Sequence, residues 1–209
     1  MIHRFSAGII VASLLFLALP ASAQFVTPTS YTLTPGEGTA QGGSFNYFDD
    51  GGTQLTDNIL GVDNWTADLG NGPAQQWVGW IVANPAASFA FTAPVSISQV
   101  QIGFNRAQGA GIFLPPTVNI NGQLFALTGT ELADNTRGFV NFDVNFTGTT
   151  LPLSLVDGTG SAWIFVDEVR FVGAEVATVP EPSALALAIP ALGMIGAMVV
   201  ARRRKNPIK

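Results

Sequence analysis

The sequence lacks several side chains on which common catalytic and metal sites depend. It has no cysteine, its one histidine is His3, and no lysine occurs before Lys205. If His3 is removed with a leader, as argued below, zinc or copper sites built from cysteine and histidine are excluded. A Ser-His-Asp or Cys-His nucleophile system and a Schiff-base lysine are excluded as well. Only carboxylates remain for acid–base chemistry, and the fold must hold without disulfides.

Positive charge is scarce between residues 24 and 178. This part has three arginines, Arg106, Arg137 and Arg170, against thirteen acidic residues, for a net charge near −10. The whole chain has a net charge of −5, because its two ends carry the other cations. With no basic patch, nucleic acid is not an expected partner. An acidic body favours solubility outside the cell and oxygen-liganded cations such as calcium.

The first 23 residues have the pattern of a secretory signal peptide. Arg4 gives a positive start, residues 7–19 are apolar, and Ala21-Ser22-Ala23 has the small side chains of a cleavage site. We expect cleavage between Ala23 and Gln24. The exported body is then 24–178, about 155 residues, which suits one domain with a single core.

The segment 179–209 has three parts that together indicate a membrane anchor. An uncharged run of nineteen residues, 183–201, is close to the roughly 20 residues that a membrane-spanning helix needs. We therefore expect a single C-terminal transmembrane helix, with the basic residues after it on the cytoplasmic side. Before it, two prolines favour an extended, accessible peptide. The short motif is Val179-Pro180-Glu181-Pro182, and the cations are Arg202, Arg203, Arg204 and Lys205.

This order of motif, span and basic end resembles the PEP-CTERM sorting signal of Gram-negative bacteria. The resemblance implies recognition by an exosortase, removal or exchange of the tail, and delivery to the cell surface or extracellular matrix. It also implies a setting of exopolysaccharide and biofilm. The alternative is an ordinary tail anchor that contains Pro-Glu-Pro by chance.

The body shows the two-residue alternation of β-strands and no convincing helical period. Apolar and polar residues alternate over 140–146 and again over 163–171, while the phase shift in 95–104 predicts a bend or bulge at Ser98-Gln99. Asn121-Gly122 predicts a hairpin turn. Short strands between turn signals predict an all-β sandwich or jelly roll. Further expected strands are 77–82, 88–92, 117–121 and 124–127.

Four stretches in order carry a second resemblance, which covers about residues 31–172. They are LTDNILG at 55–61, WVGW at 77–80, the run from PVSISQV at 94–100 to GIFLP at 111–115, and WIFVDEV at 163–169. Together they resemble the discoidin, or coagulation-factor C-type, branch of the galactose-binding-like β-sandwiches. The resemblance implies a jelly roll of about eight strands, loops at one end that often bind sugars and, in many members, a structural calcium.

The resemblance implies calcium ligands at the start and end of the body. Asp57 matches the family's loop aspartate, Glu168 matches its C-terminal carboxylate ligand, and the backbone carbonyl of Asp167 matches the ligand that precedes that carboxylate. Asp63 adds a further carboxylate if the loop folds toward the last strand, since calcium takes six to eight oxygen ligands. The alternative is that Asp57 caps a turn and Glu168 lies on a solvated strand face.

Aromatic residues divide into one binding candidate and a set of core candidates. Trp65 lies in a polar Asp-Asn-Trp-Thr segment and is the candidate for stacking on a sugar ring. Asn105 and Arg106, at the end of a long strand, are the candidate hydrogen-bonding partners of its hydroxyls. The other tryptophans, Trp77, Trp80 and Trp163, lie in strand-like runs and are expected in the core.

These features favour an exported, exosortase-sorted protein of the surface or matrix that binds carbohydrate and is not an enzyme. One alternative is a surface-sorted, carboxylate-dependent glycoside hydrolase, which would need two carboxyl groups facing each other across the substrate. Adjacent acids such as Asp49-Asp50 exist, but the sequence does not place them in space. A purely structural coat protein without a specific ligand is the other alternative.

Overall fold

The computed structural model describes residues 24–34, 38–40, 46–49, 51–63, 65, 76–81, 84–156 and 163–176. The expected signal peptide and the segment 179–209, with its expected transmembrane helix, lie outside these residues. No helix within the described ranges is long and apolar enough to cross a membrane. The chain divides into two units, Met1–Ala174 and Glu175–Lys209, and of the second only Glu175 and Val176 are described.

The described part of the chain is built from β-strands and short 3₁₀ helices, and it contains no α-helix. This confirms the expected all-β class. The strands are β1 (Gln24–Val26), β2 (Ser30–Thr34), β3 (Gly38–Ala40), β4 (Asn46–Phe48), β5 (Val78–Ile81), β6 (Ala86–Arg106), β7 (Thr117–Ile120), β8 (Gln123–Ala126), β9 (Thr136–Val156) and β10 (Trp163–Glu175). The 3₁₀ helices include η1 (Gln54–Thr56) and η3 (Gln108–Ala110).

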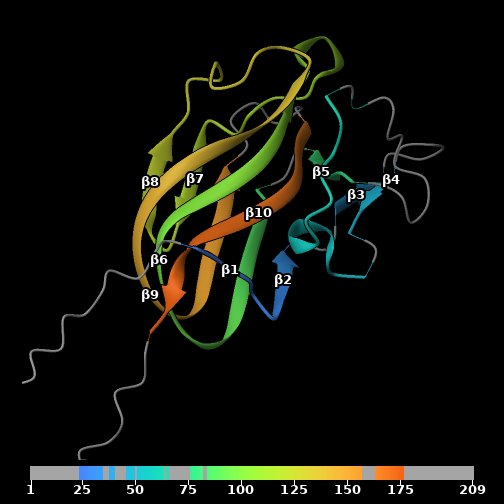
Figure 1. Ribbon diagram of the computed structural model, residues 1–209. Coiled ribbons are helices and arrows are strands. Elements are labelled where there is room, and N and C mark those ends of the chain that lie inside the picture. The colour runs from blue at the N-terminus through green and yellow to red at the C-terminus, as the bar shows by residue number, and fades with distance from the viewer. Residues whose placement is uncertain are drawn as a thin grey trace, which may run out of the picture. The chain divides into compact units, whose positions relative to one another are not determined.

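Eight strands form one sheet in the order β1-β10-β6-β9-β7-β8, with β2 also paired to β6 and β5 to β10. The two strands β3 and β4 form a separate pair. The sheet is not flat, because β6 and β9, each of 21 residues, turn over along their length (Figure 1). Register shifts in their pairing, between Ala90 and Val95 and between Ile97 and Gln99, accompany the turn.

The turn in β6 and β9 converts the sheet into a sandwich of two layers. Residues 86–90 of β6 pair with β2 and with 150–154 of β9, which continues to β7; we call this the β7 layer. The later part of β6 pairs with 136–148 of β9 and neighbours β10; we call this the β10 layer. The core lies between them, where Phe171 of β10 contacts Phe89 and Phe91 of β6 with ring centroids 4.9 and 5.4 Å apart.

Several sequence expectations are confirmed and one is corrected. The bulge falls at the expected place, and the Asn121-Gly122 turn has φ angles of 51° and 85°, which suit a tight hairpin. Trp77, Trp80 and Trp163 are buried. The correction concerns 88–92 and 95–104, which belong to the single strand β6. Pro94 does not end the strand, because it lies in the register shift where the ladder is already interrupted.

Candidate functional site

A buried ion pair lies on the outer face of the β10 layer, among the residues predicted from the sequence to bind a metal. Arg137 of β9 donates from Nε to Asp167 Oδ2 at 2.7 Å and from Nη2 to Asp167 Oδ1 at 3.1 Å. The side chain of Asp167 is fully buried and that of Arg137 is 11% exposed. Such a two-point contact fixes the guanidinium plane, and its strength depends on both partners being present.

Glycine at position 103 makes room for this pair. Strand β6 lies between β9 and β10, so Arg137 must reach across β6 to contact Asp167. It crosses at Gly103, where a Cβ atom would collide with both Asp167 Oδ1 and Arg137 Nη2. A side chain at this position would therefore displace one of the two charged groups.

The same carboxylates hold the segment 57–63 against β10. The backbone N–H of Gly61 donates to Asp167 Oδ2 at 2.7 Å, and that of Asn58 donates to Glu168 Oε2 at 2.8 Å. Asp63 lies at the end of this segment, and its Oδ1 accepts a hydrogen bond from the Arg137 backbone N–H at 3.0 Å. Both Asp167 and Glu168 thus act as acceptors for a loop 106 to 110 residues earlier in the chain.

The four predicted calcium ligands fit a metal site poorly in this arrangement. Glu168 Oε2 already accepts the Asn58 backbone N–H, and Asp57 Oδ1 accepts the Ile59 backbone N–H at 2.8 Å in a local turn. The carboxylate of Asp167, whose backbone carbonyl was the expected ligand, is occupied by Arg137 and Gly61. Among the described residues no group of three or more acidic or histidine side chains is arranged to hold a metal ion. The guanidinium of Arg137 supplies the positive charge that Asp167 needs, so calcium at this place remains only a proposal.

Burial changes the acidity of these carboxyl groups. Burial raises the pKa of Glu168 to about 7, while the Asn58 amide and Arg170 oppose the rise. The pKa of Asp57 is also raised, chiefly by desolvation. For Asp167 burial raises the pKa, and the hydrogen bonds and charge of Arg137 act in the opposite direction. Glu168 is therefore the described carboxyl group most able to change protonation near neutral pH.

The three predicted sugar-binding residues are engaged in contacts within the protein. The Trp65 ring is half-buried and stands edge-on to Phe165, with centroids 6.1 Å apart. Asn105 is fully buried, and its amide donates to the Asp63 carbonyl at 2.9 Å. Arg106 donates from Nη1 to the Leu132 carbonyl at 3.0 Å. The carbohydrate site at these three residues stays a prediction.

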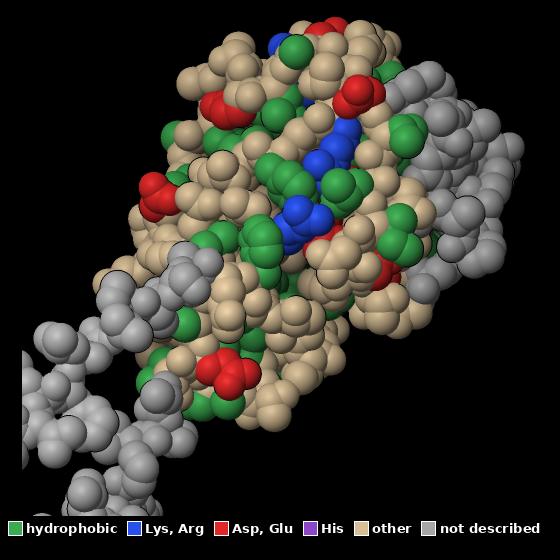
Figure 2. All heavy atoms as spheres, in the orientation of Figure 1, with side chains coloured by type: hydrophobic (Ala, Val, Ile, Leu, Met, Phe, Trp, Pro, Cys, Tyr) green, Lys and Arg blue, Asp and Glu red, His purple; other side chains and the backbone are tan. Residues whose placement is uncertain are grey.

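Two arginines and two phenylalanines form a stack on the outer face of the β10 layer that sequence reasoning missed. The guanidinium carbons of Arg137 and Arg170 lie 4.1 and 4.7 Å from the centre of the Phe139 ring. Arg170 also lies 5.6 Å from the exposed ring of Phe25. Figure 2 shows basic side chains set among hydrophobic ones near the middle of this view. Only the register of β1, β9 and β10 brings these residues together, so no local sequence signal identifies the stack.

Comparison with protein-family models confirms the first resemblance. The model described as the PEP-CTERM protein-sorting motif matches residues 178–205. This segment therefore carries that motif, which implies export and membrane-anchored sorting in a Gram-negative bacterium. Comparison with curated proteins gave no match.

Solved structures similar to this chain include CBM32 and F5/8 type C domains, the type that the sequence motifs resemble. The CBM32 of AlyQ in complex with 4,5-unsaturated mannuronic acid is 10% identical, with a TM-score of 0.43, 71% of this chain covered and 97% of that one. The family 32 CBM of Clostridium perfringens NanJ in complex with galactose is 12% identical (TM-score 0.39; coverage 72% and 98%). An F5/8 type C domain from Bacteroides fragilis is 11% identical (TM-score 0.43; coverage 75% and 100%). At these identities and TM-scores, the ligands of those domains are not transferred to this chain.

The Arg137–Asp167 pair predicts a large loss of stability on removal of the cation. In Arg137→Gln the Asp167 carboxylate stays buried without its partner, and we expect a loss of about 3–5 kcal/mol in the free energy of unfolding, measured by denaturant titration. The control is Arg106→Gln, because Arg106 contacts a neutral carbonyl. The free energy of unfolding should fall markedly less in this variant. If the guanidinium suffices, a calcium chelator leaves the wild-type melting temperature unchanged. A melting temperature that falls in chelator and recovers when calcium is added would instead establish that a metal contributes to stability.

The raised pKa of Glu168 predicts a pH dependence of stability. The folded state holds the Glu168 proton more tightly than the unfolded state does. The contribution of Glu168 to folding stability is therefore fully present below about pH 4.5 and is lost as pH rises through about 7. A shift of this size corresponds to about 3 kcal/mol between the fully protonated and fully ionised limits. Urea unfolding should show that the wild type is less stable at pH 8 than at pH 5. The difference between the two pH values should be smaller in Glu168→Gln. The exposed Glu175→Gln serves as control, and equal decreases in all three proteins would refute the assignment.

Proposed function

We propose that this protein is an exported, noncatalytic protein of the cell surface or extracellular matrix whose sandwich binds carbohydrate. The observation that carries the sorting part is the PEP-CTERM match at 178–205, which contains Glu181 between two prolines and the basic end. An exosortase would cut or exchange this tail after the expected hydrophobic helix has held the chain in the inner membrane. The same motif supports our proposal of a role in exopolysaccharide or biofilm.

The positions of the described acidic residues support a noncatalytic role. Asp49, one member of the Asp49-Asp50 pair, is fully buried and accepts hydrogen bonds from the Tyr31 hydroxyl at 2.5 Å and from two backbone N–H groups. Asp167 is likewise buried and paired. A glycoside hydrolase needs two carboxyl groups that reach the substrate from opposite sides. Carboxylates engaged in holding loops in place are poorly suited to that chemistry.

Glu168 is the best feature in favour of the hydrolase alternative, because its pKa is raised to about 7. A general acid needs a pKa near the working pH. However, the residue is 2% exposed, and one of its oxygens already accepts the Asn58 backbone N–H. We therefore assign Glu168 a structural role. The coat-protein alternative differs from our proposal only in lacking a ligand, and the binding experiment below separates the two.

Sorting predicts two processed ends and a dependence on Glu181. Intact-mass analysis of wild-type surface material should give a chain that starts at Gln24 and lacks residues 202–205. In Glu181→Ala the motif is lost, so most of the protein should remain in the inner membrane with its tail attached. Glu175→Ala, which changes a nearby acid outside the motif, should be sorted like the wild type. Recovery of most exported wild-type protein with its basic tail intact would contradict the proposal.

A further inference from the structure

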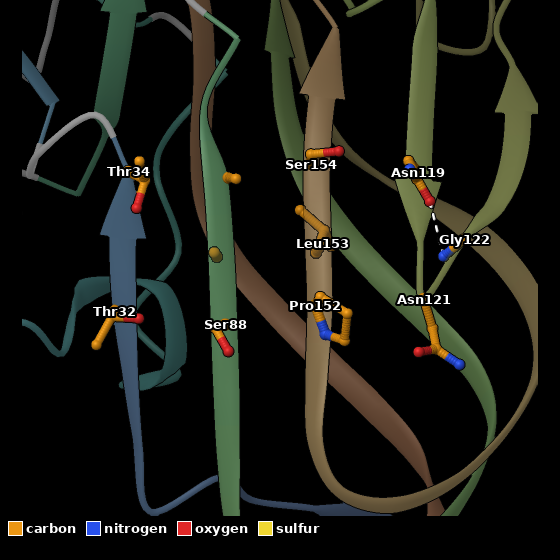
Figure 3. A pocket seen from close by; sticks show the side chains of 11 residues that line it. Thr32, Thr34, Ser88, Asn119, Asn121, Gly122, Pro152, Leu153 and Ser154 are labelled. Atoms are coloured by element: carbon orange, nitrogen blue, oxygen red, sulfur yellow. Dashed lines mark hydrogen bonds between the residues drawn. The ribbon is translucent and has the colours of Figure 1, made fainter.

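The outer face of the β7 layer carries a groove of about 330 Å³, and the described residues that line it include no charged and no aromatic side chain. Four strands contribute to it: β2, β6, β9 and β7, together with the turn that follows β7 (Figure 3). Eleven of the described residues line it, and all of their side chains are small, hydroxyl-bearing, amide-bearing or aliphatic. The groove therefore differs in chemistry from the outer face of the β10 layer, where arginines and carboxylates meet.

Strand register arranges the outward side chains of this groove in two parallel rows. One row crosses the strands as Thr34, Ala86, Ser154 and Asn119. The next begins Thr32, Ser88 and Pro152 and is continued by Asn121, whose backbone N–H donates to the Pro152 carbonyl at 2.8 Å. From β2 to β7 each row spans three interstrand spacings, or about 14 Å, and the rows lie about 7 Å apart. Each row thus presents polar groups at both rims.

Hydroxyl groups in these rows are available for a ligand. The side chains of Thr32, Thr34, Ser88 and Ser154 have no hydrogen-bond partner among the described residues. Among the described residues, the Asn119 side chain is engaged through Oδ1, which accepts the Gly122 backbone N–H at 2.9 Å. The aliphatic surfaces of Ala86 and Pro152 lie between these polar groups on the two central strands. The groove thus alternates hydrogen-bonding groups with small apolar patches, and a carbohydrate presents the same alternation of hydroxyl and C–H surface.

We infer that this groove binds an uncharged polysaccharide lying across the four strands, an inference that rests on the carbohydrate-binding function proposed above. Charge selects the class of glycan, because the body carries a net charge near −10 and the described lining of the groove offers no cation to attract an anionic polymer. The rows also indicate the length of the ligand, because polar groups recur from β2 to β7 and one extended polysaccharide segment would contact all four strands. Hydrogen bonds without aromatic stacking give weak single-site binding, so many copies on one surface would be needed for firm attachment.

This location differs from the predicted site at Trp65, Asn105 and Arg106. The side chains of Asn105 and Arg106 already donate to backbone carbonyls, and the Trp65 ring packs edge-on against the aromatic cluster around Phe165. The hydroxyls of Thr32 and Thr34, in contrast, are exposed and have no partner within the described structure. The two sites lie on different elements, so separate substitutions distinguish them.

The test measures affinity of the purified full-length chain, held in a mild detergent, for soluble neutral polysaccharides and for alginate as the anionic comparison. Affinity gel electrophoresis with dextran, galactomannan or glucomannan detects weak binding through retarded migration. The double variant Thr32→Val/Thr34→Val removes two hydroxyls but keeps shape and strand preference, and we expect at least tenfold weaker retention. Ser154→Leu fills the groove instead and should act in the same direction. Thr147→Val, an exposed change on β9 outside the groove, is the matched control.

Each outcome decides one of the two proposals. Retention of wild type on a neutral polysaccharide, lost in both groove variants and kept in Thr147→Val with unchanged melting temperatures, supports the groove. Equal retention of all variants, with loss in Trp65→Ala, overturns the groove but leaves carbohydrate binding in place. Retention of the wild type on alginate but on no neutral polysaccharide also overturns the groove and leaves carbohydrate binding in place. Wild type that is retained on no polysaccharide contradicts carbohydrate binding itself and favours the coat-protein alternative.

Discussion

The contact between Arg137 and Asp167 across Gly103 is the constraint on which one side of the molecule depends. It joins β9 to β10 over the intervening β6, and it neutralises a carboxylate that has no exposed surface. The same carboxylate accepts the Gly61 backbone N–H, and Gly61 lies so close to the Trp77 ring that a side chain there would collide with it. Loss of the pair would therefore disturb the segment 57–63 and the aromatic cluster beneath it.

The two outer faces of the sandwich differ in the side chains that they carry. On the β10 layer, a loop, two arginines and buried carboxylates are engaged with one another. Polar groups on the β7 layer line a groove in which the described residues carry no charge. The sorting motif occupies residues 178–205, after the sandwich in the chain.

Local patterns in the sequence predicted much of the fold. Alternation over 140–146 identified part of β9, Asn121-Gly122 identified the β7–β8 hairpin, and the change of phase near Ser98-Gln99 identified the register shift in β6. The short strands β1 to β4 were not predicted, whereas β7 and β8, of four residues each, were identified because they flank the Asn121-Gly122 turn. Fusion of two expected strands into β6 depended on tertiary pairing with β9, which Pro94 tolerates only because it lies at the register shift.

The sites were harder to predict than the strands. The sequence suggested that the segment around Asp57 meets Asp167 and Glu168, and these parts do lie together. It did not reveal that Arg137 takes the place expected for a cation, because that contact depends on the register of three strands far apart in the chain. The groove was missed for the same reason. Thr32, Ser88 and Pro152 are unremarkable in their own segments, and only strand pairing places them in one row.

The most direct test of this account is the stability of Gly103→Ala compared with Gly109→Ala. A Cβ at Gly103 meets Asp167 and Arg137, whereas one at Gly109 meets nothing within 4 Å. We predict that thermal unfolding shows a loss of about 1–3 kcal/mol for Gly103→Ala, as expected for overpacking, and almost no change for Gly109→Ala. Hydrogen exchange of the Gly61 amide should accelerate in the first variant alone. Equal melting temperatures and equal exchange in the two variants would contradict the central role of the ion pair.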